Sequence, residues 1–286
     1  MSVERSYREA ERLAKALMFE GYILYPYRRS SLKNMQRFAF GSLLPRGRSL
    51  ARTEDASTLR LECLVRGEAP VMAVSTRFLH YTQRSEPGDP EPWIEAEERV
   101  CELEHVDSRA LEVAGEQRVE REISGESSVE GDVTREQLTV RVRIRLTSKR
   151  IDARLTRLRV DVENLSEGEE LLHALGAVHV LMRAEAGSSF VSLLEPPKEL
   201  AEHALASCNR GCFPALVGEP GEDRVLLASP FLLYDRPALA AEVAGDLLDA
   251  AQGDGAPHPL DGSPDTRAFP PGDASCARPK NVERVP

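Results

Sequence analysis

A strict alternation of apolar and charged residues near the middle of the chain constrains the fold more than any other feature. Apolar residues occupy every second position from 138 to 146, and again from 158 to 162. Because side chains of a strand point alternately to its two faces, each run predicts a strand with one face in a core and one in water. The water-facing positions hold Arg141, Arg143, Arg145, Arg159, Asp161 and Glu163. Turn residues between the runs predict a β-hairpin.

Further β-branched and aromatic runs, separated by Gly, Pro and Ser, predict additional strands. They lie at residues 22–27, 59–65 and 71–81, and the run that contains the first hairpin strand begins at 137. We therefore expect a mainly β fold, either a β-sandwich or a strongly curved antiparallel sheet. The fold is classed as α+β if helices at the two ends pack on the sheet.

The first twenty residues predict an amphipathic helix over about residues 6–20. Ser6 and Glu9 have the capping-box spacing, and Gly21 follows as a C-terminal cap. Ala10, Leu13, Ala14, Leu17 and Met18 share one face at helical spacing. Shorter helical patterns at 197–207 and 237–250 predict two small helices towards the C-terminus.

The composition predicts one β-rich globular domain over residues 1–250, followed by a disordered tail. The chain has 286 residues and is 41% apolar, which is enough for an ordinary core. Residues 251–286 are rich in Pro and Gly and contain few large apolar side chains. Such a segment cannot bury enough surface to offset its ordering entropy.

Targeting signals and cysteine usage predict a cytoplasmic protein. The first twenty residues hold four glutamates and no secretory apolar run, and no apolar stretch approaches the roughly 20 residues of a membrane span. The five cysteines are an odd number spread over a long chain, which predicts reduced thiols and not a disulfide framework.

Charge is distributed unevenly along this acidic chain, whose formal net charge is -10. Residues 21–53 contain seven basic side chains and no acidic one, whereas residues 86–136 contain 17 acidic side chains against five arginines. One interpretation is that the two regions compensate each other within the fold. The other is that the basic segment binds an anionic group or an acidic partner.

The second interpretation has a defined set of candidate residues, because guanidinium forks beside hydroxyl and amide donors suit phosphate or carboxylate. Aromatic residues between the cations would also serve as stacking platforms for nucleic acid. The overall negative charge argues against a nucleic-acid partner. The candidate binding residues are Tyr25, Tyr27, Arg28, Arg29, Ser30, Ser31, Lys33, Asn34 and Arg37.

Four carboxylates near the C-terminal end, Asp235, Glu242, Asp246 and Asp249, offer an alternative site for Mg²⁺ or acid–base chemistry. The last three would share one face of a helix, where a merely solvated surface is the competing explanation. The pair Cys208 and Cys212 could supply half of a zinc site, but no further ligands are evident nearby. We therefore predict no cofactor and no metal, and we favour a protein without catalytic activity.

Three segments of the chain have distinctive residue patterns. They are EGYILYPYRRSSLKNMQRFAFGSLLP at 20–45, FVSLLEPPKELAEHALASCNRGCFPALVGEPG at 190–221, and SPFLLYDRPALAAEVAGDLLDA at 229–250. These segments resemble a bacterial protein family encoded beside uptake NiFe-hydrogenase genes. After Ala250 the chain departs from the acidic, ordered continuation that is usual in this family.

The resemblance implies a context of hydrogenase assembly or operation, not a reaction. Together with the basic segment it leads to the hypothesis of an accessory protein that binds an acidic partner, such as a hydrogenase subunit. The alternatives are a metal-dependent hydrolase that uses the four carboxylates and a structural component of a larger complex.

Overall fold

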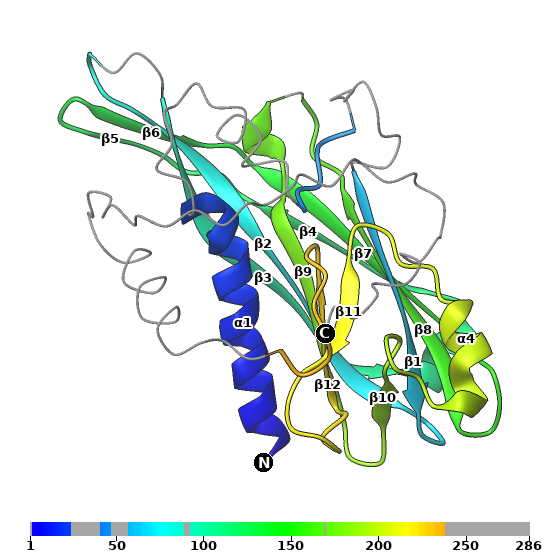
Figure 1. Cartoon of the computed structure of the whole chain (residues 1–286). Helices are drawn as coiled ribbons and strands as arrows, with labels where there is room; N and C mark the ends of the chain where they lie inside the picture. The colour runs from blue at the N-terminus through cyan, green and yellow to red at the C-terminus, as the bar shows by residue number, and fades with distance from the viewer. Residues whose placement is uncertain (1, 24–40, 47–56, 89–91, 169, 238–286) are drawn as a thin grey trace.

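A computed structural model describes residues 2–23, 41–46, 57–88, 92–168 and 170–237, and it shows two antiparallel β-sheets with one long helix against them (Figure 1). The mainly β prediction is confirmed. We call the five-stranded sheet, with strand order β10-β1-β8-β7-β4, sheet I. Sheet II has the order β11-β12-β9-β2-β6-β5, and β3 pairs with β2.

The strands of sheet I are β1 (Thr58–Arg66), β4 (Gln117–Ile123), β7 (Val140–Arg150), β8 (Leu155–Asn164) and β10 (Ser189–Val191). The strands of sheet II are β2 (Val71–Ser85), β3 (Trp93–Asp107), β5 (Ser127–Glu130), β6 (Val133–Gln137), β9 (Gly176–Ala184), β11 (Phe213–Leu216) and β12 (Val225–Ser229). The helical elements are α1 (Val3–Ile23), α3 (Ser108–Ala114) and α4 (Ala201–Leu205), with short 3₁₀ turns η1 (Leu171–His173) and η2 (Lys198–Leu200).

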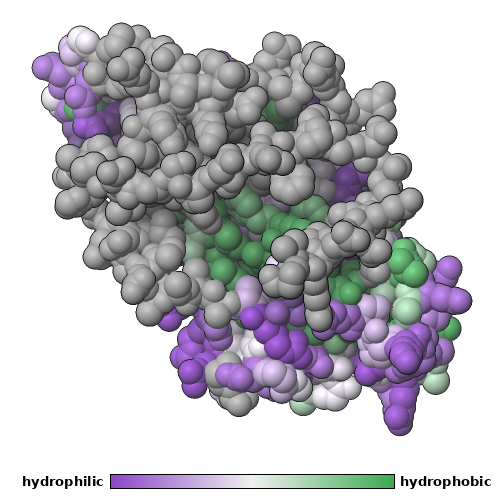
Figure 2. All heavy atoms as spheres, in the orientation of Figure 1, coloured by the Kyte–Doolittle hydropathy of each residue, from purple (hydrophilic) through white to green (hydrophobic). Residues whose placement is uncertain are grey.

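The hydrophobic core lies between the two sheets. Val142 and Val160 of sheet I belong to the same buried cluster as Val74 and Val180 of sheet II, and all four are at most 1% exposed. In Figure 2 the described residues along the lower part of the molecule are mostly hydrophilic, and hydrophobic residues are visible nearer the middle of the view. Each sheet thus uses one face of its strands for the core, as the alternating sequence requires.

The predicted hairpin is confirmed as β7 and β8, which pair antiparallel with Arg145 opposite Asp161. The expected strands at 59–65 and 71–81 are also present as β1 and β2. The expected short helix near 200 is present as η2 and α4. Strand β2 runs four residues beyond the predicted end, and there it pairs with β6.

Helix α1 packs on sheet II through the face that its sequence predicts. Ala10, Leu13 and Ala14 join Leu181 and Leu227 of β9 and β12 in a second buried cluster. This contact covers the side of β9 that faces away from the main core, so β9 is buried on both faces. The prediction of an amphipathic N-terminal helix is therefore confirmed.

The predicted ends of this helix are wrong, because α1 begins before Ser6 and continues past Gly21. The Ser2 carbonyl already accepts hydrogen bonds from the amides of Arg5 and Ser6, at 2.9 and 3.3 Å. Ser6 is fully buried inside the helix and packs against Gly218, where a Cβ would lie 2.6 Å from the serine oxygen. Residues 22 and 23 are helical and not part of a strand. Tertiary packing has thus overridden the local capping signal.

Three other expectations concern residues outside the described part of the chain. They are the strand over residues 24–27, the helix over residues 238–250 and the tail after residue 250. Among the residues that the structure describes, no helix is long and apolar enough to cross a membrane.

A buried ion pair also fastens α1 to sheet II. The Arg77 side chain in β2 is 9% exposed, and it donates to Glu98 of β3 at 2.7 Å and to Glu11 of α1. Arg84 in the same strand also pairs with two glutamates, Glu86 and Glu95, but its side chain is 34% exposed.

We predict that Arg77→Ala lowers the free energy of unfolding by about 3 kcal/mol, because it removes a buried cation and leaves two partly buried carboxylates without their partner. Arg84→Ala should lower it by only about 0–1 kcal/mol, since exposed pairs contribute little. Urea denaturation of both variants measures the difference. Equal losses would show that burial of Arg77 does not decide the strength of this contact.

Candidate functional site

The candidate residues of the basic segment, from Tyr25 to Arg37, lie outside the described part of the chain. Of the seven cations between residues 21 and 53, Arg46 is described. Its guanidinium pairs with Glu163 on the outer face of sheet I. Glu163 does not belong to the acidic stretch at 86–136, so this contact is not the compensation between the two segments that the sequence suggested.

The acidic stretch has other counterions in the described residues. Arg77 and Arg84 of β2 bind its glutamates, and so do Arg141, Arg143 and Arg150 of β7. Strands that flank the acidic residues in the sheets thus supply much of their neutralisation. These glutamates of the acidic stretch therefore have arginine counterions that do not come from the basic segment.

Asp235 is the member of the predicted carboxylate site that the structure describes. Asp235 accepts a hydrogen bond from the Leu216 amide at 2.8 Å and another from the Ser192 hydroxyl. These contacts hold the segment after β12 against the end of β11 and the residue that follows β10, so the carboxylate of Asp235 already has structural hydrogen-bond partners. Glu242, Asp246 and Asp249 lie outside the described residues. Within the described ranges, no group of three or more His, Cys, Asp or Glu side chains is placed to hold a metal ion.

The cysteines and the buried histidines have structural surroundings. Cys63 and Cys212 are buried free thiols, and burial raises the pKa of Cys63 to about 12. Cys208 is disulfide-bonded, so the expectation of a reduced thiol is wrong there. His179 is fully buried between the Ala177 carbonyl and the Ser229 hydroxyl, and burial lowers its pKa to about 4.

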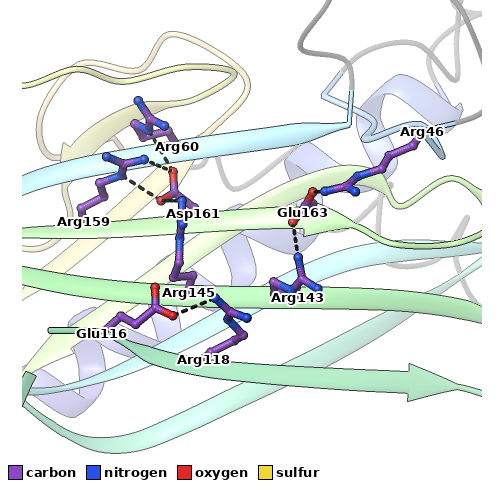
Figure 3. A network of polar contacts seen from close by, with 9 residues as sticks. All are labelled: Arg46, Arg60, Glu116, Arg118, Arg143, Arg145, Arg159, Asp161 and Glu163. Atoms are coloured by element: carbon purple, nitrogen blue, oxygen red, sulfur yellow. Dashed lines mark hydrogen bonds and ion pairs between the residues drawn. The ribbon is translucent and has the colours of Figure 1, made fainter. Parts of the chain in front are cut away.

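The arrangement that most resembles a binding site lies on the outer face of sheet I (Figure 3). Register places Arg118 of β4 opposite Arg145 of β7, which is opposite Asp161 of β8, which is opposite Arg60 of β1. An isolated antiparallel bridge then places Arg210 opposite Arg60. Directly opposite residues share a face of the sheet, so these five side chains form one row across it.

We call this set the arginine row: Arg60, Arg118, Arg145 and Arg210, with Asp161 among them. Its four cations and one anion sum to +3 on a chain whose net charge is -10, and Arg118 has a further carboxylate beside it, because it pairs with Glu116 at 2.7 Å (Figure 3). Neighbouring strands lie about 4.8 Å apart, so five adjacent segments span roughly 19 Å. The row is therefore an extended positive surface.

Asp161 is the centre of the row and is shared by several guanidinium groups. It accepts from Arg60 Nε at 2.9 Å, from Arg145 Nη2 at 3.0 Å and from Arg159 Nε at 2.8 Å. Its side chain is 13% exposed. Partial burial alone would raise the pKa of Asp161, but the hydrogen bonds from Arg60 and Arg159 outweigh it and lower this pKa. The carboxylate stays ionised and orients three cations that it cannot neutralise.

The adjacent row of the same sheet shows what a balanced arrangement looks like. There Arg143 lies between Glu120 and Glu163, donating to them at 2.8 and 2.9 Å, and Arg46 supplies the second cation. Two cations therefore meet two anions. Like charges directly opposite one another destabilise a sheet, yet the arginine row places Arg118 opposite Arg145 and Arg60 opposite Arg210. Glu116 pairs with Arg118 and offsets part of this charge, and the remaining excess of guanidinium groups over carboxylates favours recognition of an external anion.

Sequence reasoning identified Arg145, Arg159 and Asp161 only as the water-facing side of a hairpin. The usable signal was the excess of arginine at those alternate positions. Their combination with Arg60, Arg118 and Arg210 depends on the pairing of distant strands, which no local pattern in the sequence reveals.

Neither the protein-family models nor the curated proteins compared with this chain contain a match. We therefore describe the protein by its fold and by the charge of its surface. It is a two-sheet antiparallel β protein with a positive row on the outer face of sheet I.

We predict that Asp161→Asn lowers stability at neutral pH by about 1–3 kcal/mol, because charge-assisted hydrogen bonds are lost and the arginines repel each other. The native pKa of Asp161 lies below its unfolded value, so its stabilisation is complete above about pH 4 and disappears as the pH falls through the native pKa. The difference in unfolding free energy between the wild type and the variant should therefore shrink below about pH 4. A difference that is independent of pH would contradict the role assigned to the ionised carboxylate.

Proposed function

We propose that this chain is a non-catalytic accessory protein that binds an acidic partner through the positive outer face of sheet I. The observation that carries the proposal is the surplus charge of the arginine row, with three arginines converging on Asp161. The half-exposed guanidinium groups keep donors available for further acceptors, and their planar forks suit carboxylates.

An acidic protein surface fits this face better than a nucleic acid does. The arginine row is flanked by Glu120 and Glu163, and the whole chain is acidic. Because the net charge of the chain is -10, a long phosphate backbone that extended beyond the row would meet repulsion from the rest of the surface. A protein with a short series of carboxylates can match the positive row without extending beyond it.

The basic segment belongs to the same proposal. Its described member Arg46 lies against Glu163, one row away from Asp161 on the same face of sheet I. This contact supports a common binding surface for the arginine row and for Arg28, Arg29, Lys33 and Arg37. An association with a NiFe hydrogenase in the cytoplasm extends the proposal on the strength of the sequence resemblance at residues 20–45, 190–221 and 229–250. Capture of hydrogenase subunits by the tagged chain tests that extension.

We predict that Arg145→Ala weakens binding of an oligoglutamate peptide roughly fivefold, or about 1 kcal/mol, with less dependence on salt. Arg150→Ala is a matched control, because both residues lie on β7 with side chains 39% and 40% exposed. Arg150 pairs with Glu112 and lies outside the row. Fluorescence anisotropy at two salt concentrations measures both variants. Equal weakening by the two substitutions would contradict a localised site.

We also predict that Arg28→Ala combined with Arg37→Ala leaves the melting temperature nearly unchanged and weakens capture of the acidic peptide. Exposed ion pairs contribute only about 0–1 kcal/mol, so their loss should be visible in binding and not in stability. Thermal melts and anisotropy on the same preparations separate the two effects. A variant that melts lower but binds as before would assign these cations to internal charge compensation.

A further inference from the structure

Within the described residues, strand β3 (Trp93–Asp107) forms one long edge of sheet II beside β2 (Figure 1). It pairs along its length with β2, and no described strand pairs with the other side of its residues 100–104. An open edge presents a row of backbone N–H and C=O groups that can accept another strand. At 15 residues, β3 is far longer than the short edge strands with which proteins usually avoid such pairing.

The pairing pattern identifies the backbone groups that face outward. The Glu185 amide donates to the Val71 carbonyl, so the backbone groups of Val71 point towards β9. Val74 and Thr76 lie three and five residues after Val71 in β2. Residues at odd separations along a strand direct their backbone groups to opposite sides.

Because these directions alternate residue by residue, Val74 and Thr76 point towards β3 and bond its residues Leu103 and Cys101. The residues between and beside those two, Val100 and Glu102, therefore direct their backbone groups away from β2. These are the groups that an added strand would bond. The alternation ends at Glu104 and His105, which lie opposite Ala73 at a register shift.

The side chains along this edge define the composition of a strand that would fit. Cys101 and Leu103 face the main core and are each 8% exposed, so the core reaches the edge there. On the other face Val100 is 41% exposed, and Glu102 and Glu104 are exposed. An added strand would place apolar side chains beside the first face and would need basic ones beside the second.

The charge of β3 also argues against pairing with a second copy of itself. The strand contains six acidic residues and a single arginine. Two such edges side by side would bring glutamates together, and like charges across strands are destabilising. The same charges favour a basic strand from another protein.

We propose that the outer edge of β3 binds an extended segment of a partner protein by strand addition, and that this segment alternates basic and apolar residues. Backbone hydrogen bonds to the edge provide affinity, and Glu102 and Glu104 select for basic side chains. This surface is separate from the arginine row and recognises the opposite charge.

The test uses the full chain and a fluorescent peptide of about ten residues, the length of a long strand, that alternates lysine and valine. Two control peptides isolate the two contributions. In the first, glutamine replaces lysine, and in the second, alternate backbone nitrogens are methylated so that one edge of the peptide cannot bond a strand. We expect the parent peptide to bind at least tenfold more tightly than either control.

Variants of the protein locate the site. Glu102→Lys with Glu104→Lys should weaken the parent peptide at least tenfold. Glu195→Lys with Glu219→Lys changes the net charge equally at exposed positions outside β3 and should leave binding nearly unchanged. Thermal melts of both double variants confirm that each remains folded, and a folded β3 variant with unchanged binding overturns the proposal.

Three further outcomes would also overturn it. Equal binding of the methylated peptide would show attraction by charge without strand addition. A dimer in sedimentation that the β3 variant abolishes would assign the edge to a second copy. Tighter peptide binding after Arg28→Ala with Arg37→Ala would assign it to the basic segment of the same chain.

Discussion

The structure depends on the packing of two sheets over one apolar core, because this contact decides the direction of every strand side chain. Val142, Ile144 and Leu146 point inward from β7, and each is at most 1% exposed. A shift of one residue in the pairing of β7 with β8 would place arginines in the core. The cost of burying those charges fixes the register. The register in turn brings Arg145 opposite Asp161, so the apolar core indirectly builds the arginine row.

The parts of the fold that the sequence predicts well are those with a strong local period. The alternation through β7 and β8 and the apolar face of α1 are both present in the structure as expected. Strand β3 was not predicted, because its glutamates occupy both faces near its start and obscure the period of two. Its strand structure depends on pairing with β2 and on the ion pair between Glu98 and Arg77, both of which are tertiary. The capping signal at Ser6 failed for a similar reason, since packing against Gly218 places this serine inside the helix.

The candidate site was less predictable than the fold. Charge counting along the chain identified a basic segment, of which Arg46 is the member that the structure describes. It could not identify the arginine row, whose members come from β1, β4, β7 and the bridge at Arg210. A sequence shows how charge is distributed along the chain. In a sheet, however, the charge of a surface depends on side chains that come from several strands and lie side by side on one face. A region with alternating signs, such as residues 157–163, can therefore contribute to a positive surface once its neighbours are in place.

The same reasoning explains how an acidic protein can present surfaces of both signs. On sheet I the arginines of β7 neutralise glutamates of β4, and in the described part of the chain the row through Asp161 holds more guanidinium groups than carboxylates. On sheet II the buried Arg77 holds Glu98, whereas Glu102 and Glu104 lie further along β3 and are exposed. In the arginine row each of Arg60, Arg118 and Arg145 has a carboxylate partner, but Asp161 is shared among three guanidinium groups and cannot satisfy all of their donors. A partner that supplies further carboxylates can bond the remaining donors alongside the existing ion pairs. The binding surfaces of this protein are therefore expected where one carboxylate is shared among several cations, or where exposed carboxylates such as Glu102 and Glu104 lie together.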